Sequence, residues 1–88
     1  MNNDVIVLID TGLDKEIYRN RIVGGIHFYI EDEMICCDKN YNDDNGHGTA
    51  CADVITRVYK NARFFVIKIL NSEAETNYPC LLYTSDAA

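Results

Sequence analysis

The chain has 88 residues, 48% of them apolar, and its 14 acidic residues outnumber 8 basic ones, so the net charge is −6. This apolar content excludes a disordered composition, and the length allows one small domain or part of a larger one. The acidic balance, with no basic stripe, argues against nucleic acid as a partner. No apolar run is long enough to span a membrane, and the first residues lack the positive charge of a signal peptide. We therefore expect a cytoplasmic protein with no membrane partner.

The first predicted element is a strand over residues 5–9, which are all apolar and mostly β-branched. A continuous apolar run of this length is typical of a strand buried on both faces of a parallel sheet. Asp10, Thr11 and Gly12 follow directly, and the glycine is expected to end the strand in a tight turn. Asp10 then lies at the carboxyl end of a core strand, where open α/β sheets hold ligands and catalytic groups. The alternative is an acid that only caps the turn.

A surface loop or single helical turn is predicted for residues 13–22, which are mixed in charge, and a turn for residues 23–25. Two short strands, 26–30 and 34–37, are expected to form a hairpin with three acids at its tip. His27 falls in the first of these strands, where we expect a partly exposed side chain without a catalytic role.

A polar loop over residues 38–46 leads into a helix predicted over residues 48–60. The helix is expected to bury the apolar stripe formed by Cys51, Val54, Ile55 and Val58. Lys60 suits the negative end of the helix dipole, and Asn61 is expected to end the helix in the left-handed conformation.

A second apolar run, over residues 63–70, predicts another buried strand. Strand, helix and strand in this order are typical of a βαβ unit, whose crossover is right-handed in nearly all proteins. We therefore expect an α/β fold in which the two long strands lie parallel in one sheet and the helix covers one face.

His47 begins the predicted helix between two glycines, which allow backbone or substrate to approach the imidazole closely. The electropositive helix start disfavours the imidazolium, so we expect a neutral ring that accepts a proton near pH 7. If Asp10 lies beside it, the carboxylate accepts the Nδ1–H and fixes the tautomer, and the other ring nitrogen becomes a base toward a serine hydroxyl. The alternative is a histidine whose ring lies in solvent.

Residues 5–14 read VIVLIDTGLD, and residues 44–52 read DNGHGTACA. These segments resemble the aspartate motif and the histidine motif of the subtilisin-like serine proteases. Residues 23–28, VGGIHF, are similar to the segment between these motifs, and residues 63–70 are similar to the strand that follows the histidine helix. The resemblance covers residues 4–71, and the motifs occur in the order Asp then His that subtilisin itself shows.

This resemblance implies a three-layer α/β architecture with a mainly parallel sheet, incomplete in this chain. It also implies serine-type endopeptidase activity on peptide or protein substrates, with Asp10 orienting the base and His47 as the general base. Two positions depart from the family pattern. Ala50 stands where a second, non-catalytic histidine is common, and Asp53 stands where glycine is common, which bears on helix packing.

The family's nucleophilic serine and oxyanion asparagine lie far downstream of these motifs. Ser72 and Ser85 are the chain's serines, and neither has the setting of the family nucleophile. We therefore predict that residues 1–79 are the N-terminal part of a subtilisin-like peptidase domain and are inactive alone. Residues 80–88 resemble the translation of a sequencing adapter and are expected to be a non-native tail.

Two other functions stay open. A retropepsin-like aspartic protease also carries Asp-Thr-Gly after an apolar strand, but its fold is nearly all β and leaves the Gly-His-Gly-Thr segment unexplained. A catalytically decayed relative of the subtilisin-like enzymes would act as a binding protein.

No cofactor or metal site is predicted. His47 and Cys51, at i and i+4, have a spacing that can chelate zinc, but no further ligand is evident. The family often binds structural calcium, yet the acidic loop residues Asp43 and Asp44 show no ligand pattern. The cysteines match no zinc or disulfide framework and are expected to be free thiols: Cys36, Cys37, Cys51 and Cys80.

Overall fold

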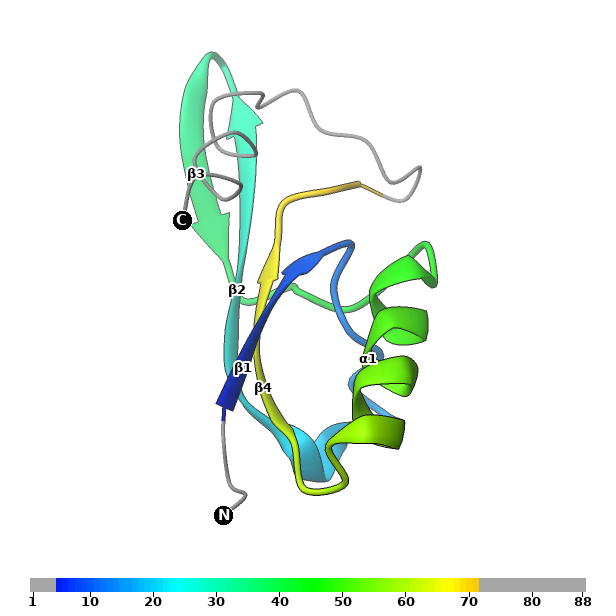
Figure 1. Cartoon of the computed structure of the whole chain (residues 1–88). Coiled ribbons are helices and arrows are strands. Elements are labelled where there is room, and N and C mark those ends of the chain that lie inside the picture. Colours follow the sequence, from blue (N-terminus) through cyan, green and yellow to red (C-terminus); the bar gives the residue numbers. More distant parts are fainter. Residues whose placement is uncertain (1–4, 72–88) are drawn as a thin grey trace, which may run out of the picture.

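The computed structural model describes residues 5–71 as one mixed sheet with a helix on one face (Figure 1). The sheet order is β1-β4-β2-β3, with β4 parallel to both β1 and β2, and β3 antiparallel to β2. The elements are β1 (Val5–Asp10), a 3₁₀ turn (Arg19–Arg21), β2 (Ile22–Glu31), β3 (Met34–Asp38), α1 (His47–Val58) and β4 (Arg63–Lys68). The predicted α/β class and the parallel pairing of the two long strands are confirmed. The two serines and the predicted tail over 80–88 lie outside the described residues.

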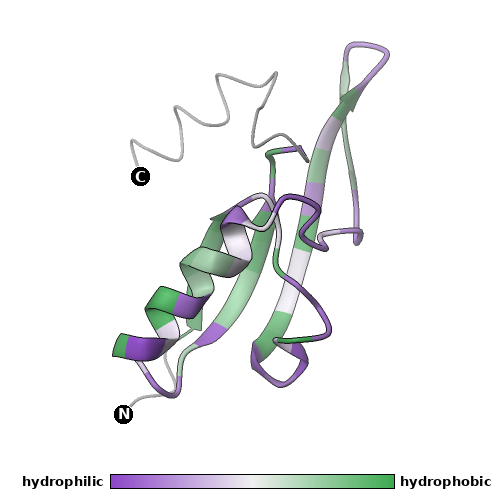
Figure 2. Cartoon of the chain, turned by 90° about the vertical axis from the view of Figure 1, so that its right-hand side faces the viewer, coloured by the Kyte–Doolittle hydropathy of each residue, from purple (hydrophilic) through white to green (hydrophobic). Residues whose placement is uncertain are grey.

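The strand β1 is buried on one face rather than on both as predicted. Leu8 is 6% exposed, whereas its neighbours Val7 and Ile9 are 54% and 37% exposed. On β4, Phe64 and Val66 point to the same covered face as Leu8 and are fully buried. Successive side chains of a strand alternate between the two faces, and in residues 5–71 only one face has a helix over it (Figure 2). The described residues therefore form two layers, and the three-layer architecture stays a prediction.

The helix α1 packs through small residues and through half of the predicted apolar stripe. Gly48 and Ala52 are its buried residues, and Cys51 and Ile55 are partly buried against the core, while Val54 and Val58 are 59% and 68% exposed. Small side chains bring the helix close to the sheet, so the face that carries them becomes the inner one. The Tyr18 hydroxyl also donates a hydrogen bond to the carboxylate of Asp53 on α1.

Within the part of the chain that the structure describes, no helix is long and apolar enough to span a bilayer.

The predicted end of α1 is wrong by two residues. The helix ends at Val58, and Tyr59 follows in an extended conformation, so Lys60 lies outside the last turn. The left-handed conformation predicted for Asn61 is absent, because the described non-glycine residues with positive φ are in the β2–β3 turn.

The predicted hairpin is confirmed as β2 and β3. Its two turn residues, Asp32 and Glu33, have φ of 52° and 65°, as a type I′ turn requires. The turn predicted at residues 23–25 is wrong, because these residues lie inside β2. Gly25 serves close packing instead, since a Cβ there would lie 2.8 Å from the Tyr41 ring.

Replacing Phe64 with alanine is expected to lower the free energy of unfolding by about 3–5 kcal/mol. The Phe64 side chain is fully buried, and its ring meets that of Tyr18 edge-on with centroids 5.9 Å apart. Urea unfolding followed by circular dichroism measures the loss. Phe65→Ala is the matched control, because Phe65 lies next in β4 on the uncovered face and is only half-buried. Equal losses for the two variants would contradict this assignment of the core.

Candidate active site

The fold brings Asp10 and His47, 37 residues apart in the sequence, into direct contact. Asp10 ends β1 and His47 begins α1. The His47 Nδ1 lies 2.8 Å from one Asp10 carboxylate oxygen and 3.0 Å from the other. Since an ionised carboxylate only accepts hydrogen bonds, the Nδ1–H donates. The Asp10 side chain is 11% exposed and the His47 side chain 60%, so the acid is buried behind a ring that is open to solvent.

The pKa of His47 is raised above its ordinary value. The hydrogen bond to Asp10 is the largest cause, followed by the charge of Asp10, and the charge of Asp43 adds to them. Desolvation acts in the opposite direction and is outweighed. The neutral ring was expected from the helix dipole, which opposes this shift. The adjacent carboxylate has the larger effect because it is a full charge in contact with the ring.

Two backbone features hold the helix start against the end of β1. Gly12 has a φ of +110°, which suits glycine, and its carbonyl oxygen would lie 2.0 Å from a Cβ on residue 48. Only glycine fits at Gly48 without displacing this contact. The Gly48 N–H donates to the Thr11 hydroxyl oxygen at 2.9 Å. The predicted role in close approach thus applies to Gly48, as backbone packing. A Cβ on Gly46 would meet nothing within 4 Å, and its φ of +105° is what suits glycine there.

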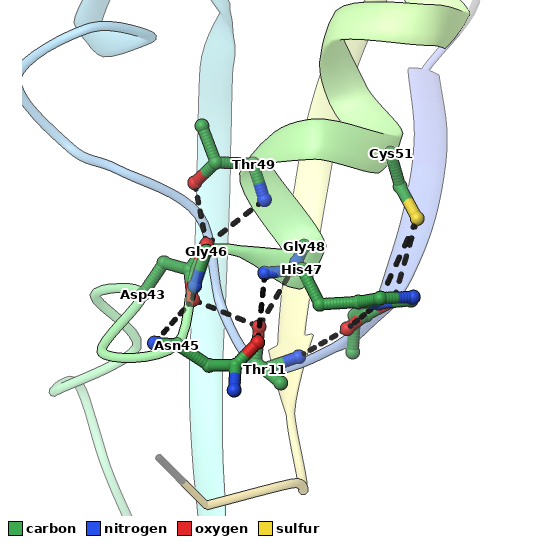
Figure 3. Close-up of polar contacts among 9 residues, drawn as sticks. Thr11, Asp43, Asn45, Gly46, His47, Gly48, Thr49 and Cys51 are labelled. Carbon is green, nitrogen blue, oxygen red and sulfur yellow. Dashed lines mark hydrogen bonds and ion pairs between the residues drawn. The ribbon is translucent and has the colours of Figure 1, made fainter. Parts of the chain in front are cut away.

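Asp43 organises the loop before the helix, a role that was not predicted from the sequence. One oxygen accepts hydrogen bonds from the Thr11 hydroxyl, at 2.8 Å, and from the backbone N–H groups of Asn45 and Gly46. The other oxygen accepts from the Thr49 N–H and hydroxyl, at 2.9 and 2.6 Å. Figure 3 shows Asp43 enclosed by these donors. The Asp43 carboxylate therefore joins the turn after β1, which follows Asp10, to the first turn of α1, which contains His47.

The electrostatics of Asp43 agree with this position. Burial by itself raises the pKa of its carboxyl, but hydrogen bonds from Thr49, Gly46 and Thr11 outweigh burial and hold the pKa well below its ordinary value. A sequence signal was present: an acid a few residues before a helix start is a common cap for the free N–H groups there. From the sequence, Asp43 was considered only as a calcium ligand, and no ligand pattern was evident. Both of its oxygens accept hydrogen bonds from protein groups.

Asp43→Asn is expected to lower the free energy of unfolding by about 1–3 kcal/mol at neutral pH, since it weakens several charge-assisted bonds. The folded-state pKa is depressed, so this stabilisation is present above the unfolded-state pKa and is lost as pH falls through the folded-state value. The difference between wild type and variant should therefore shrink in acid. Urea unfolding at several pH values measures it, with Asp32→Asn at the exposed hairpin tip as control. A pH-independent difference would contradict the assignment.

A buried lysine at the end of β4 also holds the loop that carries Asp43. Lys68 ends β4 next to Asp10 in the sheet register and is 4% exposed. Its Nζ donates to the Asn42 carbonyl oxygen at 2.7 Å and to an Asp44 carboxylate oxygen at 2.9 Å. Asp44 is thus an ion-pair partner of this lysine. The loop that carries Asp43 is held at the carboxyl ends of both neighbouring strands.

Cys51 lies one helical turn after His47. Figure 3 shows its thiol above the His47 ring, on the side away from Asp43. The sulfur is 3.8 Å from the His47 Nδ1 and 3.8 Å from an Asp10 carboxylate oxygen. Burial, followed by the charge of Asp10, raises the pKa of the thiol. Asp10 offers a further ligand atom beside these two, which sequence spacing did not reveal. Cys36, Cys37 and Cys51 are all free thiols, as predicted.

The second histidine is not part of this site. His27 lies in β2 with its Nδ1 3.0 Å from a carboxylate oxygen of Asp38, and its ring stacks on Tyr29. Its side chain is 23% exposed and that of Asp38 is 44% exposed. The prediction of a partly exposed strand histidine is confirmed.

No protein-family model and no curated protein matches this chain. The functional assignment therefore depends on the two motifs and on the geometry of the residues they bring together.

Proposed function

We propose that this chain is part of a subtilisin-like serine endopeptidase, in which Asp10 and His47 are two members of the catalytic triad. The observation that carries the proposal is the contact between a buried Asp10 carboxylate and the Nδ1 of a solvent-facing imidazole at 2.8 Å. This is the arrangement that orients a histidine as general base toward a serine. The chain order and the two motifs support the same assignment.

The proposed mechanism assigns a separate task to each residue. Asp10 accepts the Nδ1–H of His47, which leaves the lone pair of the neutral ring on Nε2. That nitrogen takes the proton of a serine hydroxyl as the oxygen attacks a peptide carbonyl, and later returns it to the leaving amine. Asp10 stabilises the imidazolium that forms in between. The raised pKa of His47 is consistent with this, because the same carboxylate favours the protonated ring.

Residues 5–71 contain no serine, so the nucleophile is proposed to lie elsewhere in the complete protein. The backbone or side-chain donors that stabilise a tetrahedral oxyanion would also come from there. We accordingly expect the 88-residue chain to lack peptidase activity. Peptide or protein substrates are expected, and cleavage specificity would depend on segments that this chain does not hold.

The contacts of Asp10 weigh against the aspartic-protease alternative. Such enzymes pair two aspartates that share one proton, whereas Asp10 is hydrogen-bonded to an imidazole. The parallel strands and α1 also differ from a nearly all-β fold. The decayed-protease alternative depends on whether the complete protein carries the nucleophile.

An activity-based probe tests the proposal on the complete gene product. A fluorophosphonate should label one serine covalently, and pepstatin-type compounds should leave peptide hydrolysis unchanged. The 88-residue chain is the control and should not be labelled. Absence of labelling in a folded complete protein would overturn the serine mechanism, and inhibition by pepstatin would favour the aspartic alternative.

A further inference from the structure

Three different metal-ligand atoms converge at the junction of β1 and α1. Asp10, His47 and Cys51 each offer one ligand atom, and these atoms all lie within 4.8 Å of one another. The carboxylate Oδ2 lies 3.0 Å from the His47 Nδ1, and the Cys51 sulfur lies 3.8 Å from both. Each atom now takes part in hydrogen bonding within this group, so a cation would replace those contacts.

These separations suit a tetrahedral ion. With bonds of about 2.0–2.3 Å to oxygen, nitrogen and sulfur, tetrahedral zinc ligands lie about 3.3–3.6 Å apart. The observed spacings of 3.0, 3.8 and 3.8 Å need shifts of only a few tenths of an ångström. The His47 side chain is 60% exposed and that of Asp10 is 11% exposed, so the three atoms lie close to the surface. Thiolate and imidazole together favour zinc over calcium or magnesium.

We propose that Asp10 Oδ2, His47 Nδ1 and Cys51 Sγ form an inhibitory Zn²⁺ site that competes with the Asp10–His47 hydrogen bond. The inhibitory consequence depends on the proposed peptidase function, whereas metal binding does not. The Asp10 carboxylate lies beside both the imidazole and the thiol, so the local field favours positive charge. A divalent cation benefits from the same field.

The change of protonation explains the inhibition. On binding, the Cys51 thiol releases its proton to solvent and binds as thiolate. In the neutral His47 ring, the proton moves from Nδ1 to Nε2, and the Nδ1 lone pair binds the ion. The Nε2 atom then carries a hydrogen and has no lone pair for a serine proton. The inhibition is reversible, because removal of the ion restores the tautomer with its hydrogen on Nδ1 and its lone pair on Nε2.

Cobalt substitution tests the metal site without reference to activity. The probe is Co²⁺ added to the 88-residue chain with Cys36, Cys37 and Cys80 changed to serine, its fold checked by circular dichroism. A near-ultraviolet thiolate-to-cobalt band is expected, and Zn²⁺ should displace it. Adding Cys51→Ser should abolish the band. If the triple variant does not fold, the wild type is compared directly with Cys51→Ser and the band should decrease. A band unaffected by Cys51→Ser, or no band, would overturn the site.

The regulatory half is tested on the complete protein. Zn²⁺ should block fluorophosphonate labelling, and a zinc-selective chelator should restore it. Cys51→Ala should lose this sensitivity, measured against its own metal-free labelling. Equal zinc sensitivity in both proteins, or none in the wild type, would overturn the inhibitory role. Absence of labelling in metal-free wild type would instead contradict the proposed peptidase function, and the cobalt band would still decide the metal site.

Discussion

Changing His47 to alanine in the complete protein is expected to reduce kcat for peptide hydrolysis by on the order of 10⁶-fold, the loss known for the triad histidine of subtilisin itself. The physical reason is that no other described group lies in contact with Asp10 and offers an exposed nitrogen base. The imidazole is anchored at 2.8 Å to a buried carboxylate, so its free nitrogen has a defined direction. Steady-state kinetics and the rate of fluorophosphonate labelling both report this loss.

His27 provides a matched control. It is the other histidine of the chain, and its Nδ1 also contacts a carboxylate oxygen, that of Asp38, at 3.0 Å. His27→Ala should leave labelling and hydrolysis close to the wild-type level, because the pair lies on the β2–β3 hairpin. A comparable loss in both variants, or undiminished labelling of His47→Ala, would remove His47 from the mechanism.

Asp10→Asn is expected to lower kcat by about 10⁴-fold, since an amide no longer enforces the productive tautomer or stabilises the imidazolium. It should also move the acid limb of the pH–rate profile. The base must be unprotonated, so activity rises with pH through the pKa of His47. Asp10 raises that pKa, and its removal should shift the limb to lower pH. The measurement is kcat/KM as a function of pH.

Asp38→Asn is the matched control for this second prediction. It removes a carboxylate that contacts the other histidine and should change neither the rate nor the position of the acid limb. Should Asp10→Asn reduce the rate but leave the acid limb unmoved, Asp10 would not be the carboxylate that sets the pKa of His47. A limb that moved to higher pH would contradict the sign of its electrostatic effect.

The site also contains a layer of support that is distinct from the pair itself. Asp43 and Lys68 hold the loop and the helix start, and neither contacts the His47 ring through a hydrogen bond among those described. Their removal is expected to act on stability and on the placement of His47, and loss of the Asp43 charge should also lower the pKa of His47. The Asp10 and His47 variants should instead alter the protonation chemistry with less effect on unfolding. Comparing unfolding curves with pH–rate profiles separates these two kinds of residue.

Local sequence patterns were sufficient for the type and order of the main elements and for the location of the candidate site. The apolar runs that became β1 and β4, the hairpin and the helix that starts at His47 each follow from patterns within a short stretch of chain. Asp10 after a strand and His47 at a helix start were identifiable for the same reason. These features depend on side-chain period and turn residues, which neighbouring positions encode.

Only the tertiary structure decided which faces are covered and which groups meet. The exposure of Val7 depends on whether another layer lies over that face, and the use of Gly25 depends on Tyr41, 16 positions along the chain. The hydrogen bond from Thr11 to Asp43 joins residues 32 positions apart, and the contact between Cys51 and Asp10 joins residues 41 positions apart. Contacts at such separations arise from how the elements pack, and spacing within one segment carries no information about them.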